Sequence, residues 1–286
     1  MKNNASLKKH LLSFEENRKK SISSFPSPDE RAAYANAIAE CFVPCAKKIF
    51  AGHFEVKDNE SGVVREIHPT VIELYYHEER VGGFKDPIMY HTKDRKYYDY
   101  YVGKNGELKT PKSPSYFNIR GINNVPFFPV GSLNPHSSGI DVTFENPKEE
   151  YRASFLIREY ELYFRESESQ KRRVPGTIKN STDIYDDMLI YGISYDGIVW
   201  KDDNNEYVKE QELDPKAYIE KHCTNRKNVP AYLPLDVRPK DQECPQLWRK
   251  KEKADGMPPY IKSGDFKYEH CSFPWQFRSA EIEKKK

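Results

Sequence analysis

Four segments of the chain alternate apolar and polar residues with the period of two that is typical of β-strands. They are rich in β-branched and aromatic residues, and Gly, Pro, Asn or Asp lies at their ends. The segments are HFEVKD (53–58), TVIELYY (70–76), GIDVTFE (139–145) and YRASFLIREYELYF (151–164). We therefore expect each of them to be a strand.

Two other segments carry apolar residues at helical spacing. SPDERAAYANAIAECFVPCAKKIF opens with Ser-Pro and acidic residues, which predicts a helix over residues 28–41. We expect Pro44 to interrupt this helix and a short second helical piece to run through Lys47 and Ile49. Farther along, STDIYDDMLIYGI predicts another helix, capped by its first Ser or Thr.

The order of these elements predicts the fold class. The strands do not alternate regularly with helices, as a doubly wound parallel sheet would require. We expect an α+β fold: a single domain with a curved, largely antiparallel β-sheet, flanking helices and an inserted hairpin region. The expected organisation is an N-terminal segment (1–27), the α+β domain (28–229) with a tyrosine-rich insertion (93–130) that contains an Asn-Gly hairpin turn, and a C-terminal extension rich in Pro and charge (230–286).

Composition supports a folded protein. Only 37% of the 286 residues are hydrophobic and 31% are charged, but 20 Tyr, 15 Phe and 3 Trp provide large apolar surfaces. The first 25 residues lack the continuous apolar stretch of a signal peptide or membrane span, so we expect a cytoplasmic protein with no membrane partner. The five Cys residues include no CxxC pair, which argues against a disulfide framework.

The net charge of +2 does not by itself predict a nucleic-acid partner. Basic residues nevertheless gather in two stretches, and such runs are most often solvated surface. The first stretch consists of Arg165, Lys171, Arg172, Arg173 and Lys179, and the second of Arg249, Lys250, Lys251 and Lys253. If they contact phosphates instead, the DNA-binding residues are Arg165, Lys171, Arg172 and Arg173.

Glu73 stands in the middle of an otherwise apolar and aromatic strand, where Glu is uncommon. Alternation places Glu73 and Tyr75 on one face, and Ile72, Leu74 and Tyr76 on the other, which is apolar enough to face the core. A carboxylate beside an aromatic ring in a partly desolvated site can act as a general base. The alternative is an exposed Glu on the outer face of a half-solvated sheet.

Arg158 follows three large apolar residues, which is an unfavourable place for a guanidinium unless a carboxylate or a substrate anion accompanies it. Its simplest role is a salt bridge to a neighbouring strand. A role beside the reacting atoms is the alternative.

Several common kinds of site lack their sequence signals. His77, His91 and His136, taken with Asp86 or Asp141, match no metal-binding spacing. The chain contains no GxSxG, Walker or GxGxxG motif, so serine hydrolases, P-loop proteins and dinucleotide-binding proteins are not favoured. We expect no metal and no cofactor.

The order of several blocks resembles the alkyladenine (3-methyladenine) DNA glycosylase family. The blocks are AKKIFAGHFEV, IELYYHEERVGGFKDPIMYHT, SSGIDVTFE, ASFLIREYEL and DIYDDMLIYGI, and together they span residues 46–193. The specific points are few. Glu73 and Tyr75 fall on the family's Glu-x-Tyr, His91 falls on its base-contacting His, and Arg158 falls on the Arg after its apolar strand.

The resemblance implies base excision from double-stranded DNA by a monomeric enzyme. Glu73 would activate the water that attacks the sugar C1′, with Arg158 beside it, and Tyr75, His91 and His136 would contact the flipped base. No Lys is placed for Schiff-base chemistry, so the expected product is an abasic site without strand cleavage. The pathway would be DNA repair or the removal of modified bases from foreign DNA.

The chain also departs from the family. HEERVGGF lengthens the interval after Glu73, and NPHSSGID lacks the tyrosine of the hairpin that fills the space left by the flipped base, where Leu133, His136 or Phe128 would serve. The family's guanine-excluding Asn has no clear counterpart, although Asp141 and Glu145 lie in that region. A longer rim would suit a bulky modified base. The alternatives are a non-catalytic nucleic-acid-binding protein of the same fold and an unrelated hydrolase that uses Glu73 as its base.

Overall fold

A computed structural model of the chain defines the fold. It describes residues 5–22, 30–57, 62–80, 83, 84, 86, 101–102, 108–109, 127–136, 139–165, 177–181, 183, 184, 187, 198–203, 213–226, 232–234, 260–262 and 273–279.

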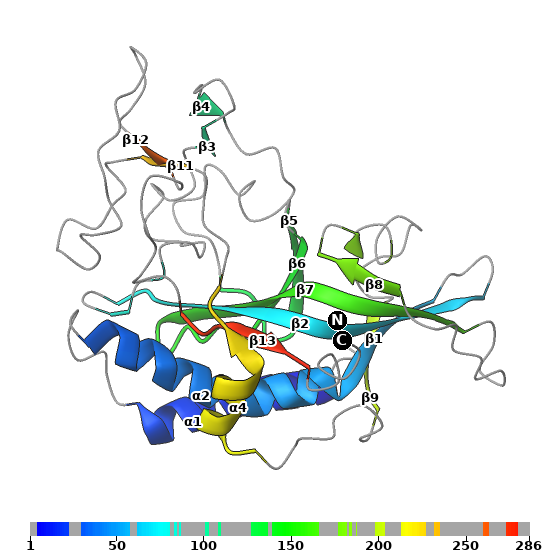
Figure 1. The fold of residues 1–286 in the computed structure, drawn as a ribbon, viewed down its shortest axis with the longest axis horizontal. Coiled ribbons are helices and arrows are strands. Elements are labelled where there is room, and N and C mark those ends of the chain that lie inside the picture. Colours follow the sequence, from blue (N-terminus) through cyan, green and yellow to red (C-terminus); the bar gives the residue numbers. More distant parts are fainter. Residues whose placement is uncertain are drawn as a thin grey trace.

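A curled antiparallel sheet of nine strands forms the centre of the molecule (Figure 1). Its main path runs in the order β10, β13, β2, β7, β6, β5; β1 pairs with β2 and β9, and β8 pairs with β7. The strands are β1 (Gly52–Lys57), β2 (Val64–Glu78), β5 (Ser132–His136), β6 (Gly139–Thr143), β7 (Tyr151–Arg165), β8 (Thr177–Asn180), β9 (Ile198–Asp202), β10 (Cys223–Thr224) and β13 (Gln276–Arg278). The α+β class and the antiparallel sheet are therefore confirmed, and each of the four expected strands is present.

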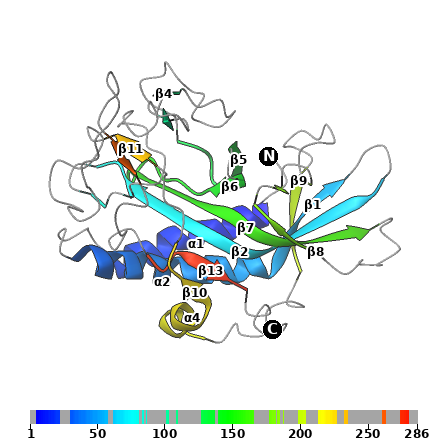
Figure 2. The ribbon, with the colours of Figure 1, turned by 45° about the horizontal axis from the view of Figure 1, so that its top comes forward.

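Helices cover one side of the sheet. These are α1 (Ala5–Ser21), α2 (Arg31–Phe50) and α4 (Pro215–His222). Two views show them below β2 and β7, whereas β5 and β6 rise on the opposite side (Figures 1 and 2). The sheet thus has a core face, packed on the helices, and a second face toward which its β5 edge curls.

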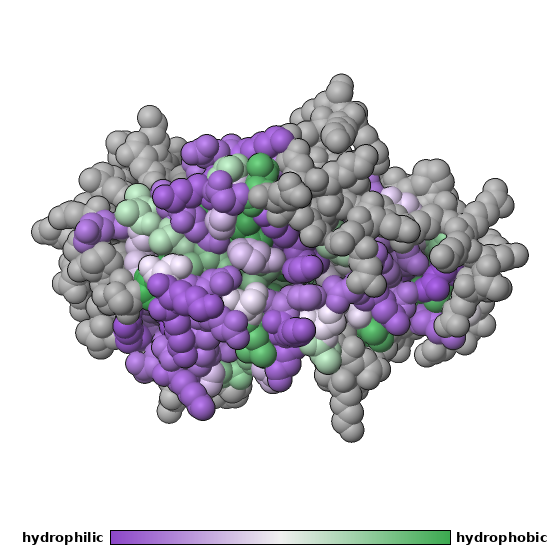
Figure 3. Space-filling model, turned by 90° about the horizontal axis from the view of Figure 1, so that it is seen from below, coloured by the Kyte–Doolittle hydropathy of each residue, from purple (hydrophilic) through white to green (hydrophobic). Residues whose placement is uncertain are grey.

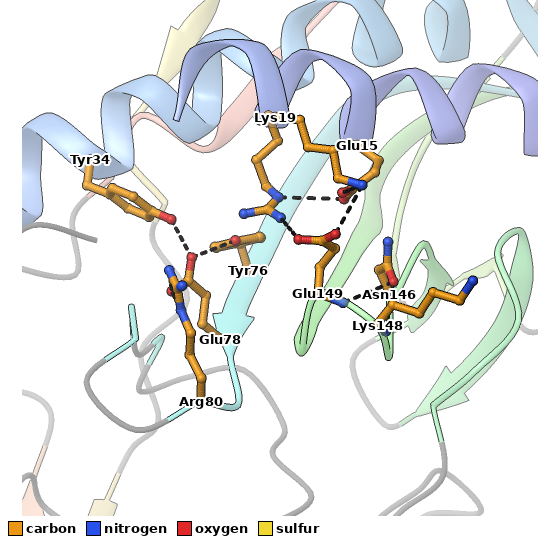
Figure 4. Close-up of polar contacts among 10 residues, drawn as sticks. Glu15, Lys19, Tyr34, Tyr76, Glu78, Arg80, Asn146, Lys148 and Glu149 are labelled. Carbon is orange, nitrogen blue, oxygen red and sulfur yellow. Dashed lines mark hydrogen bonds and ion pairs between the residues drawn. The ribbon is translucent and has the colours of Figure 1, made fainter. Parts of the chain in front are cut away.

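The first segment of the chain is part of the core. Leu7, Leu11 and Phe14 of α1 are buried, and their spacing of four and three residues places them on one side of the helix. Phe14 contacts the rings of Phe42 and Phe144 edge-on. Ion pairs hold the end of the helix, because Arg18 and Lys19 both contact Glu149 near the start of β7 (Figure 4). Residues 5–22 therefore supply part of the helix layer that packs on the sheet.

The prediction that Pro44 interrupts the helix is wrong, because α2 runs without interruption from Arg31 to Phe50. A proline inside a helix removes one backbone hydrogen bond and crowds the preceding turn. Here Phe42, Val43, Cys45 and Ala46 on either side of it are buried in the core. Tertiary packing outweighs the local preference of the proline.

In the two long strands β2 and β7, the alternation of core-facing and outward-facing residues is shifted at a pair of bulges. In β7 the core residues Phe155 and Ile157 keep a spacing of two, and the next core residue is Tyr160. The pairing of β2 with β7 shifts on either side of Val71, so that Val71 lies opposite Glu159 and Ile72 lies opposite Ile157. Arg158 is the extra residue of this bulge. Bulges of this kind change the direction of a side chain and increase the local twist of a sheet.

The remaining predicted segments are only partly covered by the described residues. The short strands β3 (Tyr101–Val102) and β4 (Leu108–Lys109) pair with each other, as do β11 (Tyr232–Pro234) and β12 (Tyr260–Lys262), and most of the expected insertion lies outside the described residues. Of the helix expected after residue 180, only Ile184 and Asp187 are described as helical. From the expected C-terminal extension, β13 enters the sheet beside β2.

The outer side of the helix layer is mainly hydrophilic (Figure 3). Among the described residues only Leu12 exposes a large hydrophobic side chain, at 44%. None of the described helices is long and apolar enough to cross a bilayer.

Candidate active site

Glu73, Tyr75 and Arg158 contact one another on the second face of the sheet. The Tyr75 hydroxyl donates to Glu73 Oε2 at 2.9 Å, and Arg158 Nε donates to the same oxygen at 2.5 Å. Arg158 Nη2 also donates to the Tyr75 hydroxyl at 3.1 Å. Glu73 is only 1% exposed, so the solvated outer Glu is excluded for this structure. Three residues that the sequence selected thus form one polar cluster.

The local fold explains why these side chains meet. Ile72, Leu74 and Tyr76 of β2 join the core as expected, and this turns Glu73 and Tyr75 to the second face. Leu156 lies opposite Glu73 on β7, so a regular strand would place its neighbour Ile157 toward the core and Arg158 again on the second face. The bulge then keeps both Arg158 and Glu159 away from the core face, because the next core residue is Tyr160.

The electrostatics of the cluster keep Tyr75 neutral and Arg158 charged. Burial and the neighbouring Glu73 carboxylate raise the pKa of Tyr75 well above its usual value. Burial alone would lower the pKa of Arg158, but Tyr75 and Glu73 outweigh it and raise that pKa. Tyr75 is therefore a hydrogen-bond donor to a carboxylate whose negative charge a guanidinium balances.

A fully buried ion pair supports the ring of Tyr75. Arg226, which follows β10, makes a two-pronged contact with Asp86 at 2.8 and 2.9 Å. Its guanidinium lies 4.9 Å from the centre of the Tyr75 ring, and Arg226 Nη1 donates to the Leu74 carbonyl at 3.1 Å. This cation–π contact fixes the ring that donates to Glu73.

A row of paired residues that are polar except for Leu156 crosses five neighbouring strands. Gln276, Glu73, Leu156, Asp141 and Asn134 lie opposite one another in turn on β13, β2, β7, β6 and β5. Residues that are paired across strands point to the same face, so this row lies on the second face. Glu73 and Asp141 are separated by two strand spacings, about 10 Å between their Cα atoms.

Asn134 in this row and Ser154 next to it are buried side chains with unused polar atoms. Asn134 Nδ2 and Ser154 Oγ make no hydrogen bond in the described part of the chain. Ser154 lies opposite Tyr75 on one side and opposite Thr143 on the other. Buried donors of this kind are normally satisfied, so they mark places where a ligand or water can bind.

Two predicted base-contacting residues, His91 and His136, have side chains outside the described part of the structure. His91 lies outside the described residues, and only the backbone of His136 is described, opposite Gly139 in the β5–β6 hairpin. Leu133 packs against the core, which argues against its use as an intercalating wedge. The backbone N–H of Phe128 donates to Glu145 Oε2 at 2.7 Å.

The long HEERVGGF interval is anchored through its acidic residues. Glu78 points to the core face, where Tyr34 and Tyr76 donate to it and Arg80 pairs with it at 2.9 Å (Figure 4). Glu79 contacts the buried Arg152 at 2.5 Å. Gly83 is required beside this carboxylate, because an added Cβ would lie 2.7 Å from the Glu78 Cβ. The Glu78 contacts lie between the sheet and the helices, whereas Arg152 alternates with the core residue Ala153 and lies on the second face.

The predicted DNA-binding residues are described only at Arg165. Its guanidinium contacts Glu55 and lies 3.0 Å from Glu66 Oε1. Its charge is therefore balanced within the protein, which does not favour a phosphate contact. Lys171, Arg172 and Arg173 lie outside the described residues, and Lys179 pairs with Asp187 at 2.8 Å.

A second polar cluster lies on the same face of the sheet, farther along β2. His53 from β1, His68 from β2 and Asp203 after β9 place three ligand-type atoms within 4.8 Å of one another. Burial alone would lower the pKa of His53, but Asp203, Glu55 and Glu66 raise it to about 9. None of these residues belongs to the set of histidines considered from the sequence, which was His77, His91 and His136. In the structure, His77 Nδ1 accepts a hydrogen bond from the Asp86 backbone N–H.

Sequence reasoning missed Arg226, Gln276 and Asp203 as neighbours of these clusters. Gln276 pairs with Glu73 from a three-residue strand at the far end of the chain. Arg226 reaches Asp86 across 140 residues. Only helix α4 before Arg226 had a local signal, because Asp214 caps it and Pro215 occupies its first position.

Comparisons of the chain with protein-family models, curated proteins and solved structures gave no match.

Proposed function

We propose that the protein is a monofunctional DNA glycosylase that hydrolyses the N-glycosidic bond of a damaged or modified base. The observation that carries the proposal is the contact of Glu73 with Arg158 and Tyr75 on the face of the sheet away from the core. The resemblance to alkyladenine DNA glycosylases selects the same three residues. The neighbouring polar row, with its unused Asn134 and Ser154 atoms, supports a ligand-binding face.

In the proposed reaction Glu73 orients a water and accepts its proton while the water oxygen bonds to C1′ of the sugar. The bond between C1′ and the base nitrogen breaks, and the base leaves with the bonding electrons and takes up a proton. Positive charge develops on the sugar, and the nearby carboxylate stabilises it. Tyr75 holds the carboxylate through its hydroxyl, and Arg158 balances its charge.

The substrate side of the proposal rests on double-stranded DNA as the partner of a cytoplasmic monomer. An extruded base would stack against Tyr75, His91 and His136, and the basic residues at 171–173 would contact phosphates. We propose that the tyrosine-rich stretch at 93–130 is an inserted hairpin region that meets DNA. A bulky modified base of foreign DNA and a repair lesion are both compatible with this arrangement.

A base-excision assay tests the proposal. The protein is incubated with duplexes that carry alkylated, deaminated or bulky modified bases, and hot alkali then cleaves any abasic site. We expect strand breaks with at least one duplex and a loss of about 100-fold or more for Glu73→Gln, because proton transfer by a positioned group contributes about this much. Glu159→Gln is the matched control, since Glu159 lies on the same face, pairs loosely with Arg278 at 3.9 Å and should leave the rate unchanged.

The burial of Glu73 supports a second candidate, a nucleic-acid-binding protein without catalysis, in which the ion pair only joins β2 to β7. Binding of plain duplex that weakens with salt, with no strand breaks from any base, would favour this candidate. Equal cleavage by Glu73→Gln and the wild type would reject the proposed mechanism. Hydrolysis of small substrates alone would point to a different hydrolase.

A further inference from the structure

The second polar cluster has the geometry of a metal site. His53 Nδ1 lies 2.7 Å from Asp203 Oδ1, and His68 Nδ1 lies 3.6 Å from Asp203 Oδ2. The two imidazole rings stack with centres 4.6 Å apart and an angle of 24° between them. Ligand atoms around a tetrahedral Zn²⁺ with bonds of about 2.0 Å are about 3.3 Å apart, which falls within this range.

The short contact between His53 and Asp203 is not an aligned hydrogen bond. His53 Nδ1 makes no hydrogen bond in the described structure although Asp203 Oδ1 is 2.7 Å away, and the other carboxylate oxygen, Asp203 Oδ2, makes none either. His53 is only 5% exposed, so water does not replace the missing partner freely. An imidazole nitrogen and a carboxylate oxygen that lie close together without an aligned hydrogen bond are arranged as two ligands of one cation.

The other nitrogen of each imidazole faces a carboxylate. His53 Nε2 lies 3.5 Å from Glu55 Oε1, and His68 Nε2 lies 3.4 Å from Glu66 Oε2. Arg165 contacts both carboxylates. Metal-bound histidines commonly donate their second N–H to a carboxylate, which fixes the tautomer and turns the first nitrogen toward the metal. Both histidines of this cluster have that arrangement.

The charges around the cluster also favour a cation. Glu55 and Glu66 lie directly opposite each other on β1 and β2, and Asp203 and Glu161 add two more carboxylates on neighbouring strands. Only Arg165 and Lys201 oppose them among the described residues that are paired with this cluster. Carboxylates gathered around two imidazoles in this way favour the binding of a cation.

We propose that His53, His68 and Asp203 bind one divalent transition-metal ion, with Glu55 and Glu66 orienting the two histidines. Two imidazoles and one carboxylate suit Zn²⁺ or another ion that prefers nitrogen and oxygen ligands, and leave a coordination position for water. The site joins β1, β2 and β9 and lies five residues along β2 from Glu73, about 17 Å away. It is therefore separate from the proposed glycosylase chemistry.

Metal titration of the full-length, tag-free protein tests the site. After chelation and dialysis, the protein is titrated with Zn²⁺ and with Co²⁺, whose visible absorption reports its ligands. We expect one equivalent to bind, and Asp203→Asn to weaken binding by at least about 100-fold. Asp202→Asn is the matched control. Asp202 is the residue before Asp203, but its carboxylate pairs with His10 at 3.0 Å and not with the cluster, so this variant should bind the metal as the wild type does.

Thermal unfolding provides a second measurement. A metal that binds only the folded protein raises the melting temperature, so Zn²⁺ should stabilise the wild type and Asp202→Asn but not Asp203→Asn. The Co²⁺ spectrum of the wild type remains informative if Asp203→Asn fails to fold. The proposal is wrong if the wild type binds no Zn²⁺ in the micromolar range, if several equivalents bind regardless of Asp203→Asn, or if Zn²⁺ leaves the melting temperature unchanged.

Discussion

Glu73 and Arg158 form a pair whose partners have unequal access to water. Glu73 is 1% exposed, whereas the Arg158 side chain retains 15% exposure. Loss of the arginine leaves a buried carboxylate without its counter-charge, while loss of the carboxylate leaves a guanidinium that can still reach solvent. The two halves of the pair should therefore differ in their effect on stability.

A double-mutant cycle measures this difference. We expect Arg158→Met to lower the free energy of unfolding by about 3 kcal/mol, because removal of one partner of a buried ion pair is strongly destabilising. Glu73→Gln should have a smaller effect, and the double variant should be more stable than Arg158→Met alone. Urea denaturation at pH 7 gives the three values. Strict additivity would mean that the two side chains do not stabilise each other.

Glu78 predicts an acid-dependent contribution to stability. Burial alone would raise the pKa of Glu78, but hydrogen bonds from Tyr34, the Phe84 backbone and Tyr76, with the charge of Arg80, lower it. A lowered pKa in the folded state stabilises the protein above the unfolded-state pKa of about 4.3, and this is lost as the pH falls through the folded-state pKa.

Glu78→Gln should therefore lower the free energy of unfolding most at neutral pH, and its difference from the wild type should shrink below about pH 4. Denaturation curves across this range measure the difference. Tyr34→Phe is the control: it should destabilise the wild type but add little in the Glu78→Gln background, because its partner has already changed. A constant difference at all pH values would contradict this role of Glu78.

At the scale of elements, alternation in the sequence carried most of the information. It predicted the opposite faces of Glu73 and Ile72, as the structure has them. Helix α1 also had a usable signal in Leu7, Leu11 and Phe14, which charged neighbours obscured. Strand β13 had none, because three residues are too few for a pattern and its partner in β2 lies about two hundred residues earlier.

Pro44 offers a test of how helix α2 is stabilised. Pro44→Ala restores a backbone donor inside a continuous helix, so we expect the free energy of unfolding to rise by about 1 kcal/mol or more. Pro44→Gly restores the same donor but loosens the unfolded chain, so its gain should be smaller. Urea denaturation of both variants gives the comparison. A loss of stability in Pro44→Ala would show that the ring packs favourably against its neighbours.

At the scale of the whole molecule, helix α1 and strand β13, which are the first and last described elements, contribute to one core. Trp275 and Phe277 from the end of the chain are fully buried, and the Trp275 indole donates to the Ala35 carbonyl of α2 at 2.9 Å. The chain therefore closes its fold by placing β13 between β10 and β2.

Removal of residues 273–286 should prevent stable folding. Loss of a single buried Trp or Phe side chain costs about 3–5 kcal/mol, and a whole domain is stable by about 5–15 kcal/mol. We expect the truncated protein to be insoluble or to lack a cooperative unfolding transition by circular dichroism, and Trp275→Ala to fold with reduced stability. A truncated protein that unfolds cooperatively would show that β13 is dispensable.

The position of β13 also has a consequence for synthesis. Glu73 is made about two hundred residues before Gln276, its neighbour on β13. Until then β2 has an open edge of unpaired backbone groups, which other strands can bind. The candidate active site is therefore completed only after β13 has left the ribosome, and a nascent chain must be protected at this edge until β13 pairs with it.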